Sequence, residues 1–390
     1  MVVAALAAGA LLLLPSAVPD DLHLGHVDVG QVFGVHTVAR AARYERFLAV
    51  DWVLSQITLL VVLAVYARRG IGYIRESAAG PIGTGMLLGM LGLAFVWLAG
   101  LPFRLASHWW DRRYGLTHVD YLSWVFQDWA VLAAEFVSIC VALLVVMGLA
   151  RRLHERWWLP GAAVFVAIGA LFTFVSPYLD YSTKPLHDQR LLAAARRFEA
   201  DQGLGNVPIR VEKVSDDTQQ ANAYSWGLGP SRQVVLWDTI LQPPFTKAEQ
   251  KVVLAHELGH QSSEHIPKGI AWFAIFAIPG AWILMRATRR RGGMGRPEAI
   301  PLALLVVAVL QLAALPAQNW ISRRMEAEAD WKALESTKDP GAMRRLMVSF
   351  AASSVVDPSP PTWEDVMLGT HPTLEQRVAM AQAWAARNGR

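Results

Sequence analysis

IPLALLVVAVLQLAALPA occupies positions 300 to 317, and no charged residue interrupts it. An α-helix needs about 20 mostly apolar residues to cross the hydrocarbon core of a membrane. This stretch therefore predicts a membrane-spanning helix. The residues that follow it, from Ser322 through Leu334, are rich in charge and also have a helical pattern.

Composition places the whole chain in the same class. Of its 390 residues 54% are hydrophobic and 17% are charged, whereas soluble domains carry about 25% charged residues. The net charge is +4, but Lys and Arg fall in short clusters between apolar stretches, as in loops that flank spans, so no nucleic-acid partner is expected. Cys140 is the single cysteine, which excludes an intrachain disulfide and a cysteine-based metal site.

Seven apolar stretches predict spans, and two polar regions separate or follow them. The first stretch resembles a signal peptide in position, but it lacks a basic beginning and a small-residue cleavage site, so a retained span is favoured. The expected organisation is residues 1–180 with five spans, 181–265 polar, 266–317 with two spans, and 318–390 polar. The spans are Val2–Val18, Trp52–Ala67, Ile82–Phe103, Trp124–Ala150, Trp157–Leu179, Ile266–Ala287 and Ile300–Ala317.

The first polar region predicts a small α+β unit. Helical periodicity runs through Lys184–Gln202, and Pro208–Val214 has the pattern of a strand. Ala221–Leu228 and Gln233–Leu241 are rich in aromatic and β-branched residues and are separated by a Gly-Pro-Ser turn, which predicts a hairpin. The expected fold is thus a mostly α, polytopic membrane protein with about seven transmembrane helices and a small α+β region.

The sequence VVLAHELGH, residues 252–260, carries the chemistry. Thr246 and Glu249 form a capping-box pattern that starts a helix through this segment. His256 and His260 then lie one turn apart on one helical face, where two imidazoles can bind one zinc ion and Glu257 can act as general base. The alternative is a pair of ordinary helix histidines. His265 falls off this face and is expected to be exposed.

Catalytic zinc takes three protein ligands and an open position. The third is expected in MEAEAD, residues 325–330, where Glu326 and Asp330 share a helical face and Glu328 points away. Glu326 can ligate the metal while Asp330 accepts the N–H of a ligating histidine. An ordinary charged helix face is the alternative interpretation.

Four sequence blocks resemble the CAAX prenyl protease type 1 family of membrane-embedded zinc metalloendopeptidases. They are Asn222-Ala223-Tyr224 with the following VVLWDT, then HELGH, then RRMEAEAD, then His371-Pro372 with Arg377. The order of the blocks and the placement of the spans agree with that family as well. The resemblance is strong for the catalytic region and loose for the first 180 residues.

The resemblance implies functional roles that spacing alone does not show. Glu326 corresponds to the third zinc ligand and Asp330 to the acid behind a histidine. Asn222, Ala223 and Tyr224 lie on a strand beside which a substrate peptide runs. His371 corresponds to a histidine that stabilises the tetrahedral oxyanion. Arg377 faces the site, and the helices of the family enclose a chamber within the membrane.

The resulting expectation is a multi-pass cell-membrane zinc metalloendopeptidase with one Zn²⁺ per chain. Its partners are membrane lipid and a peptide or protein substrate, which the family's name extends to lipidated proteins. One alternative is a quality-control protease that degrades damaged membrane proteins with the same chemistry. Another is a non-catalytic membrane scaffold, against which the presence of Glu257 and of all three ligand candidates argues.

Overall fold

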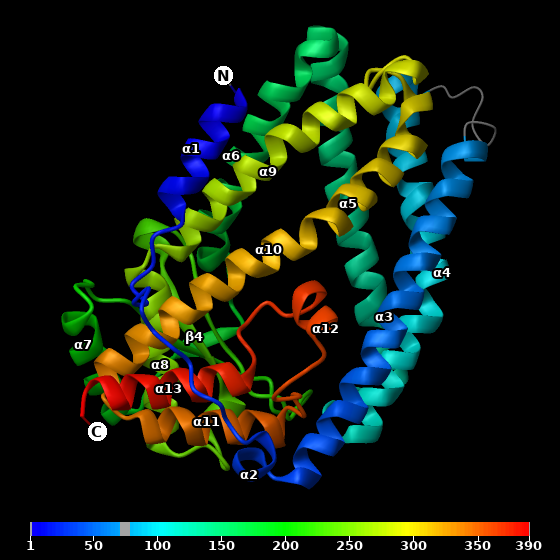
Figure 1. Ribbon diagram of the computed structural model, residues 1–390. Helices are drawn as coiled ribbons and strands as arrows, with labels where there is room; N and C mark the ends of the chain where they lie inside the picture. The colour runs from blue at the N-terminus through cyan, green and yellow to red at the C-terminus, as the bar shows by residue number, and fades with distance from the viewer. Residues whose placement is uncertain (1, 71–78, 390) are drawn as a thin grey trace.

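The computed structural model describes residues 2–70 and 79–389 and is dominated by long helices. Figure 1 shows these helices extending away from a part that holds the small sheet and the C-terminal helices. The long helices are α3 (Val35–Arg69), α4 (Gly80–Tyr114), α5 (Tyr121–Leu153), α6 (Trp158–Leu179), α9 (His265–Thr288) and α10 (Ile300–Thr337).

Within the described residues, five helical segments are long and apolar enough to cross a membrane. One of them, Tyr121–Leu179, contains both α5 and α6, joined by a short 3₁₀ turn, and so corresponds to two of the expected spans. The first expected span, Val2–Val18, is represented by α1 (Val2–Leu13), whose 12 residues are fewer than the roughly 20 that a full span requires. The expected count of seven spans is therefore not confirmed.

The outward faces of the long helices are apolar. Val137 of α5 and Phe172 of α6 are 66% and 69% exposed in the isolated chain. Large apolar side chains are stable on such a surface when lipid, and not water, surrounds them. This surface is what a membrane-spanning bundle presents.

Small residues bring the spans close together. Cβ atoms added to Gly85 and Gly89 of α4 would lie 2.3 Å from the Met147 sulfur and 2.6 Å from a Leu143 methyl of α5. Two glycines four residues apart occupy one helical face, which lets neighbouring helices approach closely in a membrane. The contact between α4 and α5 thus depends on these two positions.

The polar part contains a four-stranded mixed sheet in the order β1-β2-β4-β3. Strands β2 (Ile209–Glu212) and β4 (Gln233–Trp237) run parallel at its centre, and β1 (Thr183–Pro185) and β3 (Ala223–Trp226) pair antiparallel at the two sides. The expected hairpin corresponds to β3 and β4, in the register Ala223 opposite Leu236. Among the described strands, β3 is an edge strand.

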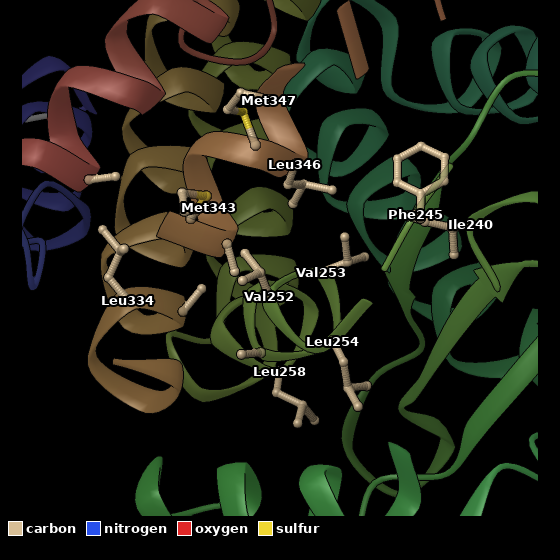
Figure 2. Packing of buried hydrophobic residues seen from close by; sticks show 14 of the residues in the cluster. Ile240, Phe245, Val252, Val253, Leu254, Leu258, Leu334, Met343, Leu346 and Met347 are labelled. Carbon is tan, nitrogen blue, oxygen red and sulfur yellow. The ribbon is translucent and has the colours of Figure 1, made fainter. Parts of the chain in front are cut away.

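Helix α8 (Lys247–Ser262) lies at the centre of the polar part. Leu254 and Leu258 are fully buried, and Figure 2 shows the side chains of α8 near Met343 and Leu346. One apolar cluster joins residues from both polar regions, because α9 and α10 form a hairpin that returns the chain to α8. The remaining helices are α2 (Val29–Phe33), α7 (Gln189–Asp201), α11 (Pro340–Ser353), α12 (Thr362–Met367) and α13 (Leu374–Arg387).

Candidate metal centre

A reciprocal cap fixes the start of α8. The Thr246 amide donates to Glu249 Oε2 at 2.7 Å, and Thr246 Oγ1 accepts from the Glu249 amide. Ser349 of α11 donates to the other oxygen of Glu249 at 2.7 Å, so the cap is also held from a second helix. The predicted capping box is confirmed, and it sets which face of α8 carries His256 and His260.

Three side chains from two helices converge on one point. His256 Nε2 lies 3.2 Å from Glu326 Oε2 and 3.1 Å from His260 Nε2, and His260 Nε2 lies 3.5 Å from Glu326 Oε1. Two imidazole nitrogens and a carboxylate are a donor set that zinc prefers, and tetrahedral bonds of about 2.0–2.2 Å separate ligand atoms by roughly 3.3 Å. In addition, Glu326 Oε2 is buried and accepts no hydrogen bond from any residue that the structure describes. These residues therefore fit a zinc ion.

The close approach of α10 to α8 depends on a glycine. A Cβ atom added to Gly259 would lie 3.1 Å from both Cα and the carbonyl oxygen of Ala329, which is main chain that cannot rotate away. Ala329 lies between the two acids of α10 that face α8, Glu326 and Asp330. Gly259 therefore permits the helix spacing at which Glu326 reaches the two histidines.

Replacing Gly259 by leucine is expected to push the two helices apart. Inserting a larger side chain into a packed contact costs about 1–3 kcal/mol, and here the displaced helix carries Glu326. We expect a lower melting temperature and weaker zinc binding, both measured on purified protein. Gly269→Leu is the matched control, because Gly269 is exposed and no atom of the described residues lies within 4 Å of its added Cβ. Equal zinc affinity in Gly259→Leu and Gly269→Leu would contradict this role.

His256 contacts a buried pair of charged residues, Asp330 and Arg377, on the side away from Glu326. Its Nδ1 lies 2.9 Å from Asp330 Oδ1, and Arg377 of α13 donates to both Asp330 oxygens, at 2.8 and 2.6 Å. Burial alone would lower the pKa of His256, but Asp330 and Glu326 outweigh it and raise this pKa to about 10. The surroundings of His256 therefore favour positive charge. Arg377 was expected to face the site. It donates to Asp330, and through Asp330 it is linked to the ligand candidate His256.

Glu257 points to the edge strand. The Ser225 hydroxyl lies 2.6 Å from the Glu257 carbonyl oxygen and 3.1 Å from its carboxylate Oε2. Glu257 is also buried, so this hydroxyl limits where the carboxylate can turn. Ser225 was not predicted as a site residue. The available signal was its position on the strand that Asn222, Ala223 and Tyr224 had already singled out.

Strand β3 pairs with β4 on one side, and all four of its residues are partly buried. The Tyr224 hydroxyl donates to Glu212 on β2, whereas Asn222 lies exposed just before the strand, and its Oδ1 accepts from the Ala223 amide. Since β3 is the edge of the described sheet, its outer side is where an extended peptide can pair. The residues predicted to bind substrate thus lie next to Ser225 and Glu257.

His371 lies on the loop between α12 and α13. Its Nε2 is 3.4 Å from Glu326 Oε2, and its side chain is 56% exposed. The helix that follows it is α13, whose cap is Thr373 with Gln376. His371 and Arg377 also line a cavity of about 990 Å³ whose opposite wall comes from α3, α4 and α5, including Trp52, Phe103 and Trp124.

The predicted exposure of His265 is wrong. This residue was expected to be exposed, but it is 5% exposed, and its Nδ1 lies 2.9 Å from His260 Nδ1. The prediction assumed that α8 continues through residue 265, but this helix ends at Ser262. Glu264 instead adopts a left-handed conformation with φ of 55°, which starts α9 in a new direction and turns His265 back toward His260.

The chain matches known proteins both over most of its length and within the part that holds this site. The model of peptidase family M48 matches residues 185–385, which is 201 of the 390 residues and spans every block of the site. The chain belongs to peptidase family M48. Together with the apolar helices, this membership makes the chain a multi-pass membrane metalloprotease, and a peptide or protein is its substrate.

Individual relatives extend the match beyond the catalytic region. An uncharacterized metalloprotease of Bacillus subtilis, YhfN, is 24% identical over 396 aligned positions, covering 94% of this chain and 90% of that protein. A CAAX prenyl protease 1 homolog of Arabidopsis thaliana is 31% identical over 173 positions, covering 42% of this chain and 39% of its own. The crystal structure of S. mikatae Ste24p superposes with a TM-score of 0.72 at 16% identity, covering 97% and 96% of the two chains. The M48 chain therefore shares the Ste24p fold over nearly its full length, as the sequence resemblance implied.

Proposed function

We propose that this M48 chain is a zinc metalloendopeptidase whose metal is held by His256, His260 and Glu326. The observation that supports this most directly is the convergence of three donor atoms at separations that suit tetrahedral zinc. A bound zinc ion supplies Lewis-acid polarisation of a carbonyl group and lowers the pKa of a water molecule. The other steps belong to residues of the chain itself.

Glu257 is the general base in this proposal. Its carboxylate takes a proton from the attacking water and delivers it to the amine that leaves. Ser225 holds one oxygen of this carboxylate at 3.1 Å, which leaves the other free to accept the proton. His371 is exposed toward the cavity and is placed to donate a hydrogen bond to the oxyanion.

Arg377 and Asp330 have a positioning role in this proposal. Asp330 accepts from His256 Nδ1, so Nε2 is the nitrogen that faces His260 and Glu326 and is placed to bind a metal. Arg377 holds both Asp330 oxygens and so fixes the carboxylate in place. The structure therefore favours an indirect role for Arg377 over direct contact with the oxyanion.

The substrate in this proposal is an extended, membrane-associated segment of a protein. It pairs with the outer edge of β3 through backbone hydrogen bonds, so its sequence preference is loose. The apolar side chains of Trp52 and Phe103 on the cavity wall can contact an apolar residue or a lipid chain of that substrate. Comparing the cleavage of one peptide with and without a prenyl group would decide whether lipid is recognised.

Metal analysis tests the centre itself. We expect close to one zinc ion per chain in protein purified without chelators, because two histidines and one carboxylate converge there. His256→Ala should remove most of that zinc, while His187→Ala, which changes an exposed histidine, should not. A zinc content near zero in gently prepared parent protein would count against the proposed centre.

A further inference from the structure

Behind His260 lies a second pair of buried polar side chains. His265, the first residue of α9, brings its Nδ1 to 2.9 Å from His260 Nδ1, and its Nε2 lies 3.2 Å from Glu328 Oε2 of α10. Both His265 and Glu328 are buried, at 5% and 7% exposure. His260, His265 and Glu328, from three helices, thus form a continuous hydrogen-bonded series that starts at the metal centre.

The direction of the hydrogen bonds in this series follows from its two ends, which are the metal-facing nitrogen of His260 and the carboxylate of Glu328. His260 Nε2 faces Glu326 and His256, so a metal bound there takes its lone pair and leaves the proton on Nδ1. His260 Nδ1 must then donate to His265 Nδ1, which leaves the proton of His265 on Nε2. That nitrogen donates to the Glu328 carboxylate, which can only accept.

Glu328, at the far end of this series, is itself held in place. The other oxygen of Glu328, Oε1, accepts from the Ala17 amide at 3.1 Å, and Lys268 Nζ lies 4.0 Å from Oε2. Arg324, one turn earlier on α10, donates to the Leu14 carbonyl oxygen at 3.0 Å. The segment that follows α1 therefore packs against α10 and fixes the orientation of Glu328.

We propose that His265 and Glu328 form a relay that positions His260 for metal binding, as Asp330 does directly for His256. Partners of this kind fix the tautomer and the ring orientation of a ligating histidine, and losing one typically weakens metal binding about 10- to 100-fold. His265 and Glu328 are not among the three side chains that converge on the proposed metal position, so both are positioning residues. The relay rests on the proposed metal centre and adds to it the reason why Glu328 is buried.

Zinc affinity of the metal-free protein, measured by competition with a fluorescent chelator, tests the relay. His265→Ala removes the acceptor for His260 Nδ1 and should weaken zinc binding about 10- to 100-fold. In His265→Asn the side-chain oxygen takes the place of Nδ1 and can accept the same proton, so affinity should return to within a few-fold of the parent. Glu328→Gln keeps a neutral acceptor and should have an effect between these two. His187→Ala is the matched exposed-histidine control.

The outcomes separate the relay from general destabilisation and from the metal centre. Melting temperatures of the metal-free variants report on folding, and rescue by His265→Asn over His265→Ala is not expected from a loss of packing alone. The relay is wrong if His265→Ala binds zinc within twofold of the parent, or if His265→Asn binds no more tightly than His265→Ala. If the parent binds no zinc, or His256→Ala binds it equally well, the metal centre itself is wrong.

Discussion

Replacing Glu257 by glutamine is expected to abolish peptide hydrolysis while leaving zinc in place. The amide cannot take a proton from water, and general acid–base catalysis contributes about 10²–10⁴-fold to rates. Because glutamine has nearly the same shape, and Glu257 is not among the three converging donors, the metal content should remain close to that of the parent. Peptide cleavage and zinc content are measured on the same preparation.

Glu264→Gln is the matched control for this experiment. It makes the same chemical change two residues beyond the end of α8, at an exposed side chain, and should cleave at the parental rate. If Glu257→Gln cleaved as fast as the parent, Glu257 could not be the base. If it lost zinc as well, its role would be structural.

Replacing Glu326 by glutamine is expected to remove both metal and activity. The change exchanges a charged ligand for a neutral amide, and the two histidines that remain do not complete the three-ligand set of a catalytic zinc site. The melting temperature should no longer rise when zinc is added, because a ligand stabilises a protein only through binding to its folded state. Zinc titration and thermal melting measure the two effects.

Two carboxylates on the same helix give the comparison for Glu326. Glu335→Gln changes an exposed acid nine residues later and should bind zinc as the parent does. Glu328→Gln should weaken zinc binding, but less than Glu326→Gln, because it acts on His260 only through His265. If Glu328→Gln were the more damaging change, Glu326 could not be the third ligand.

Much of this site is local in sequence, and that part was predictable. Spacing along one helix places His256 beside His260 and, on α10, Glu326 beside Asp330, because helical periodicity holds within an unbroken helix. The cap at Thr246 follows from a short motif for the same reason. No local pattern encodes the meeting of the two helices; the need for a third zinc ligand suggested it, and the family resemblance supported it.

The residues that were missed depend on contacts between elements. His265 is turned inward by a left-handed residue after α8, and a helical projection cannot cross such a break. Ser225 meets Glu257 only because β3 packs on α8. Likewise, apolar composition marks the stretch at Val2–Val18 but does not fix the end of α1 at Leu13.

Helix α10 also sets the distance between the end of its apolar stretch and the proposed metal centre. It is one continuous helix from Ile300 to Thr337, with Pro316 inside it, so the end of its apolar stretch at Ala317 and the ligand candidate Glu326 lie on the same helix. Nine residues at 1.5 Å each place Glu326 at most about 14 Å beyond the apolar stretch. An extended substrate covers that height in about four residues. If the substrate is anchored in the bilayer, as proposed, no more than about four extended residues are needed between its anchor and the bond at the proposed metal centre.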